Sequence, residues 1–302
     1  MKARDYEKQV TLLLEVLPVV AGETCFALHG GTAINMFYSP LPRLSVDIDL
    51  TYLPVDNRVN SMLGINAALK RIATRIEKTL PGINVQHRQA DAKLLISNRE
   101  ATIKVEVNTV KRGCFSAPEM KTICDKAQQD FGAFCEMTVV NKPHLFGGKI
   151  CAALDRQHPR DLFDIQQILK THNFDSELKK GFIFYLLSSG RPLAEMLFPN
   201  LTDQRQTFEN QFAGMTKQLF TYSDYETTRL FLIEKIHSLL TIEDKQFLVQ
   251  FEQGVPEWDL YDFSSFPAVQ WKLLNINQLK ARNPAKYHKN YDNLEKKLFP
   301  RT

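Results

Sequence analysis

The chain has 302 residues and a formal net charge of +4, with 44% hydrophobic and 24% charged residues. This composition is that of a soluble globular protein, and the length predicts two packed parts because one compact core needs only ~150 residues. The longest clean apolar run, residues 182–187, is too short for a membrane span of ~20 residues. Residues 1–8 are too charged for a signal peptide. Five cysteines without a CxxC pair predict free thiols in a reducing cytoplasm and argue against zinc.

The first informative element is a glycine turn at residues 30–32. It follows the apolar run 25–28 and precedes another at 33–37, a pattern that predicts a strand, a tight turn and a helix. Gly30 and Gly31 let backbone N–H groups approach a triphosphate, and the N-terminus of a helix favours an anion. Thr32 is placed to cap this helix or to bind phosphate. Taken alone, the Gly-Gly pair is also compatible with a tight turn of no catalytic meaning.

A carboxylate pair follows in the alternating segment of residues 46–50. Successive side chains of a strand point to opposite faces, so Asp47 and Asp49 share one face while the apolar residues fill the other. Two like charges at one point are costly unless a cation lies between them, and Mg²⁺ prefers carboxylate and phosphate oxygens. The pair therefore predicts a divalent metal, Mg²⁺ or Mn²⁺.

Arg43 and Ser45 approach the same strand directly. Ser45 is predicted to support Asp47, and Arg43 to reach a phosphate or the acceptor. Both residues are therefore candidate nucleotide-binding positions.

A third acid is predicted at Glu106. Residues 103–108 alternate in the same way and place Lys104 and Glu106 on one face, with residues 92–97 as the hairpin partner. In-line phosphoryl displacement by two metal ions about 4 Å apart uses carboxylates as ligands, and Glu106 would complete such a set. The alternative is a half-exposed strand whose polar face meets water.

The next dense segment is residues 147–164. Helical spacing puts Lys149 and Arg156, seven residues apart, on one helix face. Pro159 is predicted to end this helix and to start a second one. The two cations are therefore placed to grip the phosphates of a nucleotide.

Arg160 and Asp161 fall in the first turn of the second helix, and Asp164 follows one turn later. The aspartates are placed to orient Lys149 and Arg156, while Arg160 is a further candidate for nucleotide binding. A structural Arg–Asp network that ties the two helices together is the alternative.

Three separated motifs occur in an order that resembles the AbiEii/AbiGii family of nucleotidyltransferase toxins. They are the glycine turn, the segment from Arg43 to Leu50, and the stretch from Lys149 to Asp164. The resemblance is specific over residues 25–170 and extends loosely to residues 266–275. The family comprises the toxins of bacterial type IV toxin–antitoxin and phage-abortive-infection systems.

The resemblance implies an α+β fold in which a polymerase-β-like nucleotidyltransferase domain, a mixed sheet with flanking helices, occupies residues 1–145. A mainly helical domain at 146–302 would contribute Lys149 and the Arg160–Asp161 corner. The family pattern also implies that the Asp47–Asp49 pair binds Mg²⁺, that the glycine turn holds the nucleoside triphosphate, and that the lysine is needed for transfer. It does not decide between Asp161 and Asp164 as the functional corner aspartate.

The activity implied is transfer of a nucleotide from an NTP to an RNA acceptor, the 3′ end of tRNA, which blocks translation. A cognate antitoxin encoded nearby and a bacterial cytoplasmic location are implied in the same way. Three alternatives remain open at this point: AMPylation of a protein hydroxyl, a metal-dependent glycosyltransferase with an Asp-x-Asp pair, and a binding protein with a decayed site.

The final segment, residues 272–302, carries eight Lys or Arg residues against two acids, with Tyr287, His288 and Tyr291 among them. Such a basic tail with interleaved aromatics suits contact with an RNA backbone. The alternatives are a solvated helix face and a surface covered by an acidic antitoxin.

Overall fold

The computed structural model describes residues 3–300, so the first two residues of the charged N-terminal segment and Arg301 of the basic tail lie outside the described part. The chain forms two compact units. The first contains the residues up to 145 together with 205–220, and the second contains 146–204 and the residues after 220. Nothing in the sequence pattern had indicated that residues 205–220 return to the first unit.

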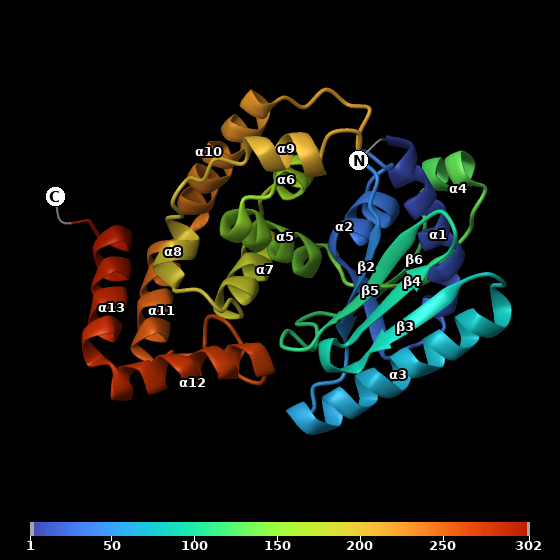
Figure 1. The fold of residues 1–302 in the computed structure, drawn as a ribbon. Coiled ribbons are helices and arrows are strands. Elements are labelled where there is room, and N and C mark those ends of the chain that lie inside the picture. Colours follow the sequence, from blue (N-terminus) through green and yellow to red (C-terminus); the bar gives the residue numbers. More distant parts are fainter. Residues whose placement is uncertain (1–2, 301–302) are drawn as a thin grey trace. The chain divides into compact units, whose positions relative to one another are not determined.

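A seven-stranded mixed sheet forms the centre of the first unit, with strand order β3-β4-β5-β2-β1-β7-β6 (Figure 1). The β2–β5 and β1–β7 pairs are parallel, and the other neighbours are antiparallel. The strands are β1 Phe26–His29, β2 Asp47–Tyr52, β3 Asn84–Arg88, β4 Lys93–Ser97, β5 Thr102–Asn108, β6 Glu119–Thr122 and β7 Glu136–Val139.

Helices α1 and α3 pack against this sheet (Figure 1). Leu13 and Leu17 of α1 and Leu69 of α3 are fully buried, as are Ile48 of β2 and Val105 of β5, so the apolar face of the central strands lies in the core. The helices of this unit are α1 Ala3–Ala21, α2 Gly30–Ala33, α3 Arg58–Thr79, α4 Asp125–Phe131 and α9 Arg205–Gln211, with a π-helical turn at Ile34–Tyr38 and a 3₁₀ turn at Gln89–Asp91.

The predicted hairpin between residues 92–97 and 103–108 is present as β4 and β5. Its turn is stabilised by Asn98, whose side-chain oxygen accepts from the backbone N–H groups of Glu100 and Ala101 at 2.9 and 2.8 Å. Asparagine favours turns because its side chain satisfies backbone donors locally. The hairpin brings β5, and with it Glu106, beside β2.

The second unit is helical. His158 precedes α6 and accepts from the N–H of Arg160, and Pro159 occupies the first turn, as predicted. Capping boxes at Thr221–Asp224 and Thr241–Asp244 start α10 and α11. The remaining bounds are α5 Lys142–Arg156, which begins in the first unit, α6 Pro159–Thr171, α7 Ser176–Leu187, α8 Leu193–Leu197, α10 Tyr222–Leu239, α11 Ile242–Gln253, α12 Pro267–Arg282 and α13 Pro284–Leu298.

The basic tail forms α12 and α13, and one of its cations is not on the surface. Lys272 is only 7% exposed, and its ammonium group donates to three backbone carbonyl oxygens, those of Leu186, Ser189 and Arg191. This lysine therefore serves packing within the second unit. Among the described residues, no helix combines the length and apolar character that crossing a bilayer requires.

Gly147 of α5 generates a test of helix packing in the second unit. A Cβ at this position would collide with the backbone of Gly181 and Phe182 in α7, so we expect Gly147→Ala to lower the free energy of unfolding by about 1–3 kcal/mol. Gly190→Ala is the control, because no heavy atom lies within 4 Å of its Cβ position. Urea unfolding of both variants measures the difference, and equal stabilities would contradict the close α5–α7 contact.

Candidate functional site

The glycine turn connects β1 directly to α2. Gly30 has a φ of +71°, and a Cβ on it would run into the carboxylate of Asp49. A Cβ on Gly31 would lie 2.7 Å from Nη2 of Arg43 and 3.0 Å from Oγ of Ser45. Gly30 is therefore favoured both by its left-handed backbone and by the close approach of Asp49, whereas a side chain at position 31 would displace the Arg43 guanidinium.

Hydroxyl groups join this turn to the start of β2. Thr32 is fully buried, and its Oγ1 donates to the carbonyl oxygen of Asp47 at 2.5 Å and lies 3.0 Å from Oγ of Ser45. The N-cap of α2 is His29, without a side-chain cap, so the prediction that Thr32 caps the helix is wrong. Its hydroxyl is used to hold the strand that carries the aspartates. Ser45 is 5% exposed and contributes to the same linkage.

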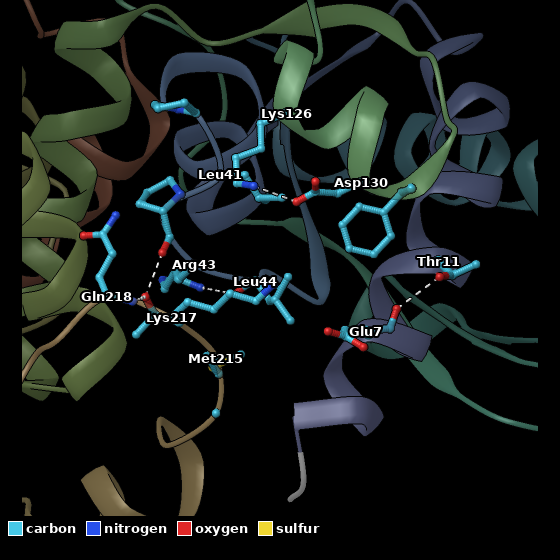
Figure 2. A pocket seen from close by; sticks show the side chains of 15 residues that line it. Glu7, Thr11, Leu41, Arg43, Leu44, Lys126, Asp130, Met215, Lys217 and Gln218 are labelled. Atoms are coloured by element: carbon cyan, nitrogen blue, oxygen red, sulfur yellow. Dashed lines mark hydrogen bonds and ion pairs between the residues drawn. The ribbon is translucent and has the colours of Figure 1, made fainter.

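Arg43 is 4% exposed, and its guanidinium donates to the carbonyl oxygen of Leu44 at 2.8 Å. It borders a hollow of about 700 Å³ that is also lined by Lys126 and by the loop around Met215 (Figure 2). The Leu44 N–H donates to the carbonyl oxygen of Met215 at 2.7 Å, and the Thr216 hydroxyl donates to the carbonyl oxygen of Pro42 at 2.8 Å. Residues 214–218 therefore support the Arg43 loop. None of the three predicted carboxylates lines this hollow.

The predicted carboxylates form part of a row across the sheet. In the strand register, His29 of β1 lies beside Asp49 of β2, Asp49 beside Glu106 of β5, and Glu106 beside Lys93 of β4. Directly paired residues point to the same face of a sheet. The structure therefore brings Asp49 and Glu106 together, with Asp47 two residues along β2 on the same face.

Two lysines balance these acids. The Nζ of Lys104 lies 3.4 Å from Asp47 and 3.8 Å from Glu106, and the Nζ of Lys93 lies 2.9 Å from Glu106. The alternation of residues 103–108 predicts that Lys104 lies on the same face as Glu106. It does not predict Lys93, because the place of Lys93 beside Glu106 depends on the register of the hairpin. The side chains of Asp47, Lys104 and Glu106 are 25%, 43% and 40% exposed, so a cation from solvent can reach them.

A hard cation fits the chemistry of this donor set, because all three acids offer carboxylate oxygens. Within residues 3–300 no group of three or more His, Cys, Asp and Glu side chains is already arranged to hold a metal. Lysine ammonium groups lie against Asp47 and Glu106 instead. Metal binding would therefore have to compete with the positive charge of Lys104.

A buried histidine lies near the turn. The ring of His144 is 5.8 Å from that of His29, in an edge-on arrangement. Burial, with a smaller effect of the positive charge of Lys111, lowers the pKa of His144 to about 3. This ring is therefore neutral at physiological pH and packs beside His29 without adding charge.

The second set of predicted residues lies around the α5–α6 connection of the second unit. Its ion-pair network, formed by Lys149, Arg156, Asp161 and Asp164, is called the charged corner. Lys149 is 6% exposed, and its Nζ lies 2.9 Å from both Asp161 and Asp164. Arg156 contacts Asp161 at 2.5 Å, but its own side chain is 63% exposed. Arg160 is partly exposed in the first turn of α6. Both aspartates thus bind the lysine, and Asp161 also pairs with Arg156.

Electrostatics hold Asp161 ionised. Burial by itself disfavours the charged form, but the positive charges of Lys149 and Arg156 outweigh it. They hold the pKa of the Asp161 carboxyl far below its ordinary value of 3.8. The corner is therefore fixed by charge pairing at neutral pH.

Gly30→Ala tests the close approach to Asp49. We expect a loss of stability of about 2 kcal/mol or more, since the left-handed backbone and the collision both oppose the side chain. Gly82→Ala is the matched control, because Gly82 also has a positive φ (+80°) but nothing within 4 Å of its Cβ position. Urea unfolding gives the stability of both variants. An equal loss of stability would show that the close approach of Asp49 adds no cost at position 30.

Asp161→Asn tests the buried network. Because the folded-state pKa of Asp161 is depressed, its stabilisation is present above the ordinary value of 3.8 and is lost as the pH falls through the folded-state pKa. We expect a loss of about 3 kcal/mol at pH 7, with the difference from wild type shrinking below about pH 4.

Asp155→Asn is the control for this variant, because Asp155 is 45% exposed in its pair with Arg191. It should cost less than about 1 kcal/mol at any pH. Urea unfolding at several pH values measures both variants, and a pH-independent loss in Asp161→Asn would contradict the charge argument.

Comparisons with known proteins identify the family and the fold of this chain. The family model of the nucleotidyl transferase AbiEii toxin of type IV toxin–antitoxin systems matches residues 11–275. MenT4, a nucleotidyltransferase toxin from Mycobacterium tuberculosis, has a similar structure, with a TM-score of 0.64 and 14% sequence identity over 91% of this chain and 94% of that chain. At this identity the likeness shows the fold alone. No curated protein sequence matches the chain.

The predicted α+β nucleotidyltransferase fold is thereby confirmed. The family match covers the glycine turn, the carboxylate strands and the charged corner, and it favours nucleotidyl transfer over the glycosyltransferase and binding-protein alternatives. The chain belongs to the AbiEii family of nucleotidyltransferase toxins of type IV toxin–antitoxin systems.

Proposed function

We propose that this toxin transfers a nucleotide from an NTP to the 3′ end of a tRNA and thereby blocks translation. The observation that supports the proposal most strongly is the placement of Asp47, Asp49 and Glu106 on one sheet face, directly beside the Gly30–Gly31 turn. Acids that converge next to a strand–helix turn suit a metal-bound triphosphate.

In this proposal Asp47, Asp49 and Glu106 hold Mg²⁺ or Mn²⁺. A divalent metal supplies charge neutralisation for the triphosphate when it is bound there. The backbone of Gly30, Gly31 and Thr32 positions the phosphates, while Ser45 and Arg43 keep that turn and the aspartate strand in register. Lys104 and Lys93 lie on the same face, where their ammonium groups would contact phosphate oxygens.

The charged corner supplies the second part of the proposal. Lys149 and Arg156, with Arg160 nearby, neutralise the charge that develops on the pyrophosphate leaving group. Asp161 and Asp164 hold the lysine in a fixed position. The acceptor hydroxyl attacks the α-phosphorus, forming the new phosphoester bond while the bond to pyrophosphate breaks. A cognate antitoxin would restrain this activity in the cell.

Incubation of the purified chain with Mg²⁺, small RNA and each of four α-³²P-labelled NTPs tests the proposal. We expect label on tRNA with at least one NTP. Asp49→Asn, Glu106→Gln and Lys149→Met should each lower the rate by about 100-fold or more, as for other groups that stabilise developing charge.

Glu100→Gln is the matched control, because Glu100 is an exposed acid in the β4–β5 turn that pairs with Lys8 and is no part of the proposed site. It should retain full activity. Label on protein instead of RNA would replace the proposal with AMPylation, and absence of label with all four NTPs would overturn it.

A further inference from the structure

Gln157 occupies the short connection between α5 and α6. It has a φ of +49° and is 3% exposed, and it directly follows Arg156. A left-handed residue after a helix is normally glycine or asparagine, since other side chains are strained there. A glutamine at this position therefore calls for compensating contacts from its side chain.

Those contacts engage both ends of the amide. Its Nε2 donates to the carbonyl oxygen of Asn200 at 2.7 Å. Its Oε1 accepts from the N–H of Thr202 at 3.1 Å and from Arg229 at 2.9 Å. The backbone carbonyl of Gln157 accepts from the hydroxyl of Tyr225 at 2.8 Å. One residue thus ties the corner to the 200–202 loop and to α10.

Arg229 is the strongest of these partners. It is 6% exposed and donates further to the Thr202 carbonyl at 2.6 Å and to the Tyr225 hydroxyl at 3.2 Å. Each of these acceptors is neutral, so the buried guanidinium of Arg229 binds only uncharged oxygens of the α5–α6 connection and its neighbours in these hydrogen bonds. Removing an acceptor from a buried charge is costly, so these hydrogen bonds oppose any movement of the α5–α6 connection.

We infer that Gln157 is the positioning residue of the charged corner. Lys149 and Arg156 lie on α5, whereas Asp161 and Asp164 lie on α6, so their contacts depend on the angle that residue 157 sets between the helices. The side-chain hydrogen bonds of Gln157 go instead to Asn200, Thr202 and Arg229. Only the expected effect on NTP binding rests on the proposed function of Lys149; the acylation readout does not.

Gln157→Gly is the sharpest variant. Glycine accepts the left-handed backbone without strain, so the substitution removes the amide contacts alone. Acylation of lysines by acetic anhydride, followed by mass spectrometry, reports whether the corner opens. Lys272 is the internal reference, because it is similarly buried in the same unit but is held by the backbone carbonyls of Leu186, Ser189 and Arg191, whereas the Gln157 side chain binds Asn200, Thr202 and Arg229.

We expect the acylation rate of Lys149 to rise by about tenfold in Gln157→Gly, through local opening, while that of Lys272 stays unchanged. Binding of α,β-methylene NTPs, tested singly, should weaken by about tenfold. Gln278→Ala, an exposed glutamine on α12, is the control and should change neither quantity.

Equal acceleration of both lysines would indicate general loosening and overturn the inference, as would no change at Lys149. If Gln157→Gly does not fold, Tyr225→Phe removes the hydroxyl that donates to the Gln157 carbonyl and accepts from Arg229, and the acylation rates of Lys149 and Lys272 are compared in that variant with the same expected and contradicting results. Failure of the wild-type protein to bind any of the four NTP analogues would overturn the proposed function instead, because acylation does not depend on nucleotide.

Discussion

The main physical constraint on the first unit is that three carboxylates, those of Asp47, Asp49 and Glu106, lie close together on one face of its sheet. Asp47, Asp49 and Glu106 lie side by side, and the ammonium groups of Lys104 and Lys93 place positive charge against Asp47 and Glu106. These pairs are half-exposed, so each contributes little to stability and can be exchanged at small cost. In the proposed function, a metal-bound triphosphate would replace these exchangeable pairs.

The surrounding structure makes that face rigid. Gly30 has no room for a side chain because Asp49 fills the space, and the buried Thr32 hydroxyl fixes the backbone of Asp47. In the second unit, the charges of the corner are buried and firmly paired, in contrast to the exposed pairs of the sheet. The sheet face thus has a backbone fixed by buried contacts and counter-ions that can be exchanged. Such a face suits electrostatic catalysis, which requires preorganised charge.

Much of this could be predicted from local sequence patterns. Period-two alternation placed Asp47, Asp49 and Glu106 on strands, and Pro159 marked the corner, because both signals act within a few residues. Of the two roles predicted for Thr32, capping of the helix was wrong, since its hydroxyl binds the carbonyl oxygen of Asp47, fifteen residues away. Lys93, Gln157 and the return of residues 205–220 depend on register and tertiary contacts, which leave no periodic signal in the chain.

The central claim is that the three carboxylates act as one cation site for which Lys104 competes. Titration of Mn²⁺, followed by electron paramagnetic resonance, tests it in the wild-type protein, Asp49→Asn and Lys104→Met. The account predicts that Asp49→Asn weakens Mn²⁺ binding by at least about tenfold, and that Lys104→Met strengthens it because a competing charge is removed. Equal Mn²⁺ affinity in all three proteins would contradict the account.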